Sequence, residues 1–340
     1  MARTVDIGRT VTVVIPTRDR LPLLREAVAS VRGQDQPSWE LIVVDDASSD
    51  GTPAWVDAVS DSRVRCIRVG NRIERSAARN RGLAEATAPL ILFLDDDDRL
   101  RPSALRRLAH GLARAPDALA AFGAKEVFDG TGHRKRIPHP RVPLVRSVWD
   151  DVMAGWMFVS GQVLLRTDAV RAAGGWDERL AMSEDQDLWL RVPGRRPAVL
   201  VPMVVLDQRT RPQGVDAAEV EDEVRARVVN SLTADERPRA ACLIDARRHL
   251  RAAGRAFDAE DFGAARCELV AAARTAPWLL ASPIWAPPLV LSTAKAVVAD
   301  ALPGRVGVHA RHSVRRVRTR LGRNPFEPGE TPIGRSLPPP

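Results

Sequence analysis

The stretch PLILFLDDDDRLRP, residues 89–102, constrains the fold of this chain more than any other. Its apolar residues 90–94 are followed at once by four aspartates, Asp95 to Asp98. An apolar run of this length, placed between a proline and a polar cluster, is typical of a strand buried on both faces. Carboxylates crowded at the end of a strand repel one another unless a cation lies among them. We therefore expect a buried strand with an acidic site at its carboxyl end.

Two interpretations of these acids remain open from this stretch alone. Mg²⁺ and Mn²⁺ take oxygen ligands, commonly one or two carboxylates together with substrate phosphates. Because ligands of open α/β sheets bind beyond the carboxyl ends of the strands, the first interpretation is a metal–diphosphate site. The second is a solvated acidic turn, in which Asp98 caps a helix that begins near Pro102.

Composition limits the class of protein without selecting a function. The chain has 340 residues, which is enough for two domains, and a net charge of +8. That charge suits an anionic substrate, a membrane surface or nucleic acid. The scattered cysteines Cys66, Cys242 and Cys267 indicate a reducing compartment, and we expect a cytoplasmic protein. We expect neither a secretory signal nor a membrane span, since no apolar run reaches the ~18 residues that a span needs.

Strand and helix patterns alternate along the first hundred residues. Strands are predicted at residues 11–15, 41–44 and 64–69, besides the opening run, with helices between them. This alternation predicts crossover units and a mainly parallel, Rossmann-like sheet flanked by helices. Right-handed crossovers bring the strand ends, including Asp45 and Asp46, to one edge of the sheet. For Asp45 and Asp46, an Asx turn that caps the next helix is the alternative interpretation.

The motifs VTVVIPTRDR, LIVVDDASSDGT, RSAARNRGL and ILFLDDDDRLRP, in this order and spacing, resemble the family 2 glycosyltransferases of the GT-A fold. The stretch SGQVLLRTDAVRAAGGWDERLAMSEDQDLWLRV resembles the acceptor-side segment of the same family, so that the resemblance covers residues 9–206. It implies a metal-dependent, inverting transfer of a sugar from a nucleoside diphosphate sugar. A UDP-sugar is the expected donor, and Mn²⁺ or Mg²⁺ the expected metal.

The resemblance also implies roles for individual residues. Thr17 and Asp46 would hold the nucleobase and ribose, and Asp97 would be the direct metal ligand. The doubled acids leave the register of the metal motif open by one residue. The residues expected to bind the donor are Pro16, Thr17, Arg18, Asp45, Asp46, Arg75, Asp95 and Asp96, and those expected at the metal are Asp97 and Asp95.

A second acidic cluster, Glu184, Asp185 and Asp187, opens an amphipathic helix. Acids in the first turn of a helix are favoured by its dipole, and for Asp187 we prefer this structural interpretation. An inverting transfer needs one general base to take the proton of the acceptor hydroxyl. The family places that base in a Glu-Asp pair here, so we expect Asp185 to be the base and Glu184 to orient it or the acceptor.

The chain departs from its relatives after the strand predicted at residues 199–206. Relatives often place a histidine there, whereas this chain offers Arg209 and Arg211, either of which could compensate the charge of the leaving diphosphate. The third metal ligand therefore stays open. Residues 130–146 read as a basic loop, either mobile over the donor or merely solvated. Trp149 and Trp156 could face the acceptor sugar or lie in the core.

The composition changes near residue 215, and helices are predicted at residues 217–232, 238–254 and 262–275. Residues 252–273 resemble one tetratricopeptide unit, which must pack on the catalytic domain or on a partner. Residues 277–325 combine tryptophans with basic residues, which suits peripheral contact with an anionic membrane. We prefer the alternative of a packed helix and a disordered tail. The expected division is a tail at 1–8, a GT-A domain at 9–214, a helical region at 215–303 and a basic tail at 304–340.

Other functions fit the motifs less well. A nucleotidyltransferase would favour a Gly- and Lys-bearing loop after the first strand, but PTRDRLP has neither residue. A catalytically inactive nucleotide-sugar or partner-binding module would be favoured by loss of the base, but Asp185 is present. We expect no nucleic-acid partner, because the Arg-rich tail lacks interleaved aromatic residues. The expected partners are the nucleotide-sugar donor and a glycan or lipid-linked acceptor.

Overall fold

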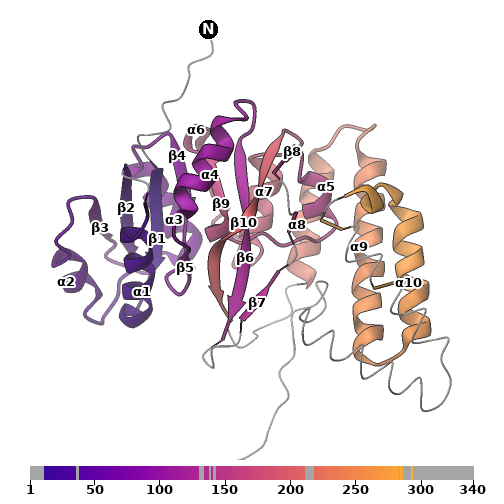
Figure 1. Ribbon diagram of the computed structural model, residues 1–340, viewed down its shortest axis with the longest axis horizontal. Coiled ribbons are helices and arrows are strands. Elements are labelled where there is room, and N and C mark those ends of the chain that lie inside the picture. The colour runs from indigo at the N-terminus through magenta and orange to yellow at the C-terminus, as the bar shows by residue number, and fades with distance from the viewer. Residues whose placement is uncertain are drawn as a thin grey trace, which may run out of the picture.

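A computed structural model describes residues 11–35, 38–129, 134–137, 139–140, 143–210, 218–282, 284–285 and 292–293 (Figure 1). The strands are β1 (Val11–Thr17), β2 (Trp39–Asp45), β3 (Val64–Arg68), β4 (Leu90–Phe93), β5 (Arg99–Leu100), β6 (Ala120–Phe128), β7 (Arg134–Arg136), β8 (Leu144–Arg146), β9 (Val163–Arg166) and β10 (Ala198–Arg209). The helices are α1 (Leu21–Arg32), α2 (Thr52–Asp57), α3 (Glu74–Glu85), α4 (Ala104–Ala113), α5 (Trp149–Met153), α6 (Thr167–Ala172), α7 (Glu184–Arg191), α8 (Ala218–Ser231), α9 (Arg237–Asp258) and α10 (Phe262–Thr275), with 3₁₀ turns η1 (Ser160–Gln162) and η2 (Pro277–Ala281).

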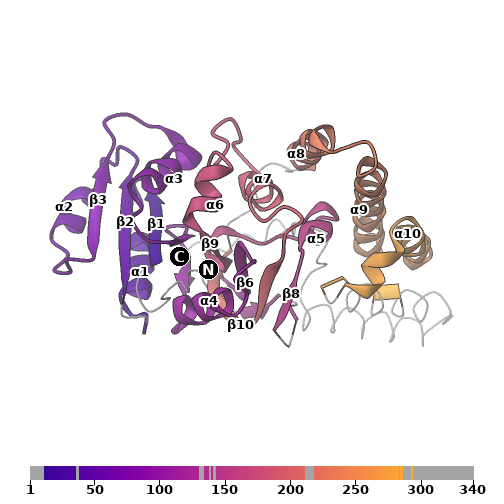
Figure 2. The same ribbon diagram turned by 90° about the horizontal axis from the view of Figure 1, so that it is seen from above.

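The strands form one mixed sheet in the order β3-β2-β1-β4-β9-β6-β10-β5, with β7 beside β6 and β8 beside β10. Strands β3, β2, β1 and β4 run parallel to one another. Strand β9 runs antiparallel between β4 and β6, and β10 is again parallel to β6. Helices α3, α6 and α7 lie on one face of the sheet and α1 and α4 on the other (Figure 2). The predicted mainly parallel α/β fold with helices on its flanks is therefore confirmed.

Close packing of α3 on β1 sets the position of the site. A Cβ atom on Gly82 would lie 2.4 Å from Cγ1 of Val14, so only glycine lets the helix approach the strand this closely. Helix α3 also buries Ala78 and Leu83 against this face of the sheet. The amino end of α3 is thereby brought to the sheet edge where β1, β2 and β4 end.

The sequence predicts a loop at residues 130–146, but the described residues of this segment include two short strands. Strand β7 pairs with β6, and β8 pairs with β10, while residues 130–133, 138 and 141–142 lie outside the described part. Arg134, on β7, forms an ion pair with Asp207 at 2.9 Å. A mobile basic loop is thus the wrong description of the described residues, whose short strands are fixed by pairing.

The C-terminal helices α8, α9 and α10 follow the predicted ranges closely and share a core with the helices on one face of the sheet. Trp149 and Trp156 belong to this core, with 3% and 5% of their surface exposed. Trp285 packs edge-on against Trp156 at 5.6 Å between ring centroids. The two tryptophans therefore do not form a platform for an acceptor sugar, and Trp285 does not face a membrane.

Several predictions of the sequence fall outside the described residues. These are the tails at 1–8 and 304–340, the boundary between 214 and 215, Arg211, and most of the segment 277–325. The domain division therefore stays a prediction. Among the helices that the structure describes, none combines the length and the apolar character needed to cross a membrane.

Candidate active site

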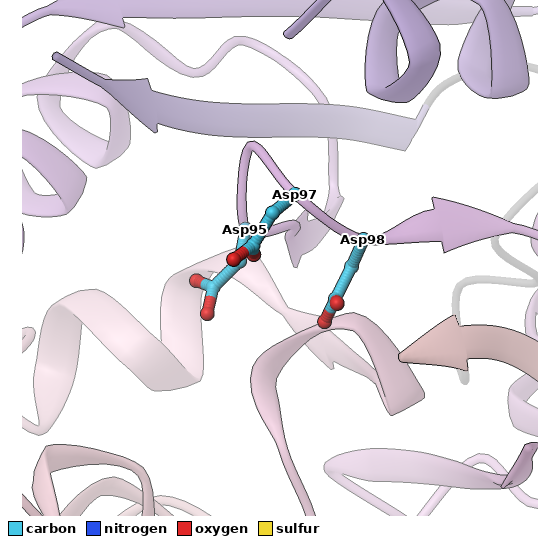
Figure 3. Close-up of side chains that lie close together, drawn as sticks. All are labelled: Asp95, Asp97 and Asp98. Atoms are coloured by element: carbon cyan, nitrogen blue, oxygen red, sulfur yellow. The ribbon is translucent and has the colours of Figure 1, made fainter. Parts of the chain in front are cut away.

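The four aspartates after β4 separate into two groups. Oxygen atoms of Asp95, Asp97 and Asp98 lie within 4.8 Å of one another. Figure 3 shows the carboxylates of Asp95 and Asp97 next to each other and that of Asp98 to one side. Asp96 is directed elsewhere: it accepts hydrogen bonds from Oγ1 of Thr17 at 2.8 Å and from Arg20 at 3.1 Å. Burial raises the pKa of Asp96, against the effect of Arg20.

The acid triad, defined as Asp95, Asp97 and Asp98, fits a hard divalent cation. It offers only oxygen ligands, and two of its members are almost fully buried, so a cation would offset their mutual repulsion. The alternative interpretation, in which Asp98 caps a helix that begins near Pro102, is wrong. The amino-terminal residue of α4 is capped by no side chain, and Oδ1 of Asp98 instead accepts a hydrogen bond from the backbone of Arg209 at 2.8 Å.

The loops after β1 and β2 are tied together, which brings the expected donor residues to one place. The backbone N–H of Asp46 donates to Thr17 at 2.9 Å. Asp19 accepts hydrogen bonds from the backbone and side chain of Ser49, and the backbone bond in particular lowers the pKa of Asp19. Arg18 lies in the same loop, with its Nε 3.6 Å from Asp19. Pro16 is in the last part of β1, paired with Val44 of β2.

Asp45 and Asp46 both stabilise backbone turns. Oδ1 of Asp45 accepts from the N–H of Ser48 at 3.2 Å, the Asx-type contact that was the alternative interpretation. The two oxygens of Asp46 accept from Ile73 at 2.7 Å and from Glu74 at 3.1 Å, at the start of α3. Asp46 thus orients α3, and its role toward a donor stays a prediction.

Arg79 is the functional residue that sequence reasoning missed. Its side chain is 1% exposed and bridges the two acidic regions, with Nη2 2.6 Å from Asp95 and Nη1 3.0 Å from Glu184. Its guanidinium lies 4.3 Å from the ring of Trp176, in the turn after α6. The sequence holds a signal for it, because Arg79 stands four residues after Arg75 and hence on the same helical face.

The turn that carries Trp176 is held by α3 as well. Gly175 has a φ of +72°, and a Cβ atom there would lie 2.5 Å from Oδ1 of Asn80. That oxygen accepts from the N–H of Trp176 at 2.8 Å, and Nδ2 of Asn80 donates to the carbonyl of Trp176 at 2.9 Å. Helix α3 therefore places both the arginine and the aromatic ring on which it stacks.

Asp185 and Glu184 lie in the first turn of α7, on the other side of Arg79 from the acid triad. Glu184 is buried and pairs with Arg75 at 3.0 Å as well as with Arg79. Oδ1 of Asp185 accepts a hydrogen bond from Ser160 at 2.7 Å. Burial, followed by the charge of Glu184, raises the pKa of Asp185 from 3.8 to about 7. A carboxyl group so perturbed, next to a possible cation site, has the chemistry of a general base.

Arg209 occupies the region in which relatives place a histidine. Its Nε donates to the backbone carbonyl of Asp97 at 3.2 Å, and its Nη2 pairs with Glu26 at 2.7 Å. The guanidinium also lies 4.7 Å from the ring of Phe128. Arg209 therefore supports the loop that carries the triad, and its expected role toward a diphosphate stays a prediction.

Comparison with known proteins agrees with this geometry. The model of glycosyl transferase family 2 matches residues 12–169. One curated relative is the GalNAc(5)-diNAcBac-PP-undecaprenol beta-1,3-glucosyltransferase of Campylobacter jejuni, 37% identical over 28% of this chain and 32% of the relative. The first curated relatives are covered over only 14%, 28% and 66% of their own lengths.

Solved structures share the fold at low sequence identity. TarS 1-349 of S. aureus, in complex with UDP-GlcNAc, superposes with a TM-score of 0.60, at 16% identity, over 91% of this chain and 92% of that one. The mannosyltransferase PcManGT of Pyrobaculum calidifontis, in complex with GDP-Man and Mn²⁺, gives a TM-score of 0.52, at 19% identity, over 91% and 80%. Sheet, acid triad and sequence match agree, and residues 12–169 of this chain are a glycosyl transferase family 2 domain.

Proposed function

We propose that the chain is an inverting, metal-dependent glycosyltransferase, which moves a sugar from a nucleoside diphosphate sugar to a hydroxyl of a glycan or lipid-linked acceptor. The observation that carries the proposal is the link through Arg79, which joins an acid of the triad to the helix of Asp185. The acid triad, on one side of Arg79, suits a cation and a diphosphate, and Asp185, on the other side, suits the role of proton acceptor. A transfer reaction needs both at one place.

The triad would hold Mn²⁺ or Mg²⁺ through Asp95, Asp97 and Asp98. Such an ion, when bound, neutralises charge on the diphosphate and on the leaving nucleotide. Thr17, Asp46 and Arg75 are the proposed contacts of the nucleotide. UDP-sugars are the proposed donors, as in the complex of TarS with UDP-GlcNAc.

Asp185 is the proposed base. The acceptor hydroxyl attacks C1 of the sugar, the bond from C1 to the diphosphate oxygen breaks, and the nucleoside diphosphate leaves with that bonding pair. The hydroxyl proton passes to Oδ2 of Asp185, since Oδ1 already accepts from Ser160. The raised pKa of Asp185 makes this carboxylate a stronger base than an exposed one would be.

The acceptor class rests on relatives, one of which carries a name that describes an undecaprenol-linked substrate. A growing glycan or a lipid-linked sugar is therefore the proposed acceptor. The apolar part of such a lipid would remain in the membrane while the sugar end reaches Asp185.

A nucleotide panel tests the donor half of the proposal. Melting temperatures are measured for the full chain with UDP, GDP, CDP and ADP, each with and without Mn²⁺. A nucleotide at 100 times its dissociation constant should stabilise the protein by about 2.7 kcal/mol, and Asp97→Ala should remove the metal-dependent part of the shift. Arg106→Gln, which alters an exposed pair with Asp35, is the control. No metal-dependent shift with any nucleotide would contradict the proposal.

A paired variant tests the transfer half. Asp185→Asn keeps the shape of the side chain but cannot take a proton, so donor binding should persist while transfer falls by about 10²- to 10⁴-fold. Transfer is followed by release of nucleoside diphosphate in the presence of an acceptor. Wild-type turnover in Asp185→Asn would remove Asp185 as the base.

A further inference from the structure

A buried arginine of the C-terminal region reaches the helix that carries the base. Arg225, on α8, has no exposed surface. Its Nη2 donates to Oε1 of Gln186 at 2.5 Å. Gln186 is itself fully buried and directly follows Asp185 in the first turn of α7. A hydrogen bond therefore joins α8 to Gln186, the residue next to the proposed base.

The remaining donors of Arg225 fix its guanidinium in place. Nε donates to the carbonyl of Met153 at 2.9 Å, and Nη2 also donates to that of Val152 at 3.1 Å. Nη1 donates to the carbonyl of Glu221 at 2.9 Å. Val152 and Met153 end α5, where carbonyl groups lack partners within the helix and favour a cation. The planar fork of an arginine serves all these acceptors at once, and a lysine could not.

A second buried arginine, Arg247 on α9, also contacts α8. Its guanidinium pairs with Glu221 and Asp222 of α8 and is 3% exposed. Gly155 makes room for it, because a Cβ atom there, at a φ of +102°, would lie 3.2 Å from Nε of Arg247. Arg247 thus neutralises two acids of α8, whereas Arg225 connects α8 to α7.

The first turn of α7 is consequently held on both sides of Asp185. Glu184 is bound by Arg75 and Arg79 from α3, and Gln186 is bound by Arg225 from α8. Ser183, at the start of the helix, has a left-handed φ of +61°, which persists only where the surroundings impose it. The direction of the Asp185 side chain depends on this turn.

We propose that Arg225 is a positioning residue for transfer, which sets the direction of Asp185 through Gln186. The inference rests on the proposed function, and it extends the catalytic apparatus well beyond residues 12–169, into the C-terminal helices. Helix α8 would then help to position the base and would not be only a support or a docking module. A misplacement of about 1 Å at a reacting group can cost about 100-fold in rate.

The test separates positioning from general packing. In the full chain, Arg225→Lys keeps the charge but loses the fork, and Gln186→Leu removes the contact from the other partner. Each should lower kcat for transfer by about 10- to 100-fold, with the KM for the donor changed less than about 2-fold. The double variant should lose no more than the worse single variant, because both changes break one link. The nucleotide- and metal-dependent thermal shift should persist in all three.

Arg247→Lys is the matched control, since it alters an equally buried arginine of the same ionic cluster that makes no hydrogen bond to α7 among the described residues. Its kcat should stay within about 3-fold of the wild type. Equal losses in Arg225→Lys and Arg247→Lys would overturn the inference, as would wild-type kcat in Gln186→Leu. If Arg225→Lys does not fold, Gln186→Leu and the control decide the matter, because both retain Arg225.

Asp185→Asn is measured alongside, so that two failures can be told apart. Loss of transfer in Asp185→Asn together with wild-type kcat in Gln186→Leu overturns the positioning role alone. Wild-type transfer in Asp185→Asn overturns the assignment of the base, and with it the inference. Loss of transfer in Asp185→Asn, Arg225→Lys and Gln186→Leu, but not in Arg247→Lys, supports both.

Discussion

The expected donor residues lie at the carboxyl ends of the parallel strands β1, β2 and β4 or just after them. The proposed base lies on α7, which follows the antiparallel strand β9 and helix α6. We call the loops after β1, β2 and β4 the donor side and the first turn of α7 the base side. On the donor side, exposed Asp19 accepts several hydrogen bonds, which lower its pKa, while burial raises the pKa of Asp96. On the base side, burial raises the pKa of Asp185.

The difference shows how one chain obtains two kinds of carboxylate. An anion that accepts several N–H and O–H bonds is stable as a charge and suits structural ties or cation binding. An anion kept away from water, with Glu184 beside it, is a better proton acceptor. Arg79 contacts acids of both sides, so its replacement should affect the donor side and the base side together.

Arg79→Gln is expected to have the largest effect. Removing the buried cation leaves Asp95 and Glu184 without their shared partner, which should cost about 3 kcal/mol of stability. Arg79 also lowers the pKa of Asp185, so its loss should raise that pKa and move the acid limb of kcat to higher pH. Both effects are read from urea unfolding and from a pH profile of kcat.

Arg81→Gln is the matched control for this change. Arg81 is on the same helix and is 54% exposed, and its one ion pair among the described residues is with Glu85 at 3.7 Å. Its replacement should alter stability by less than about 0.5 kcal/mol and leave the pH profile unchanged. If Arg79→Gln and Arg81→Gln changed the free energy of unfolding and the pH profile equally, the contacts of Arg79 would not stabilise the protein or affect the pKa of Asp185.

The second expected effect is a pair of opposite pH dependences, that of transfer measured with the metal present and that of stability measured in the metal-free protein. A general base acts as the carboxylate, so transfer by the metal-loaded enzyme should fall as pH drops through the pKa of Asp185, which burial raises and a bound cation would lower. Stability should change the other way. The folded state holds a proton on Asp185 more tightly than the unfolded state, so the stabilisation is complete below the ordinary value of 3.8 and is lost as pH rises through about 7.

Asp185→Asn sharpens this prediction, because it removes the titration without removing the side chain. In the presence of a chelator, its melting temperature relative to that of the wild type should be higher at pH 8 than at pH 5. The same difference at both pH values would mean that Asp185 is not the buried titrating group. The metal-free protein is used, since a cation at the triad would itself lower the pKa of Asp185.

The two sides also differ in how far the sequence predicts them. Strands β1 to β4 are predicted to within two residues at each end, because β1, β2 and β4 are local apolar runs bounded by a proline or an aspartate and β3 alternates in polarity. Strands β7 and β8 have three residues each, too few for a period of their own, and they exist by pairing with β6 and β10. The antiparallel position of β9 between β4 and β6 likewise depends on tertiary packing and cannot be predicted from its local sequence.

Site residues follow the same rule. That the acids after β4 form a site is visible in the sequence, but which of them turn inward is not. Asp98 is directed by a backbone N–H 111 positions away, and Asp96 by a hydroxyl 79 positions away. The identity of Asp185 as the base comes from family resemblance, while its supports, Ser160 and Arg225, come only from the packed structure.

The smallest expected effect concerns the backbone at the start of α7. Ser183 has a φ of +61°, and its side chain forms no hydrogen bond to cap the helix. A left-handed conformation costs a residue with a Cβ atom about 1–2 kcal/mol, whereas glycine adopts it readily. Because glycine also loses more chain entropy on folding, Ser183→Gly should be more stable than Ser183→Ala by about 1 kcal/mol, measured by urea unfolding. Ser103, at the start of α4, offers the same comparison at a φ of +66°, but its hydroxyl bonds Asp35 at 2.6 Å, so both of its replacements should also lose that contact. If Ser183→Gly were no more stable than Ser183→Ala, the turn that carries the base would not be strained, and the contacts of Arg79 and Arg225 would have no strain to oppose.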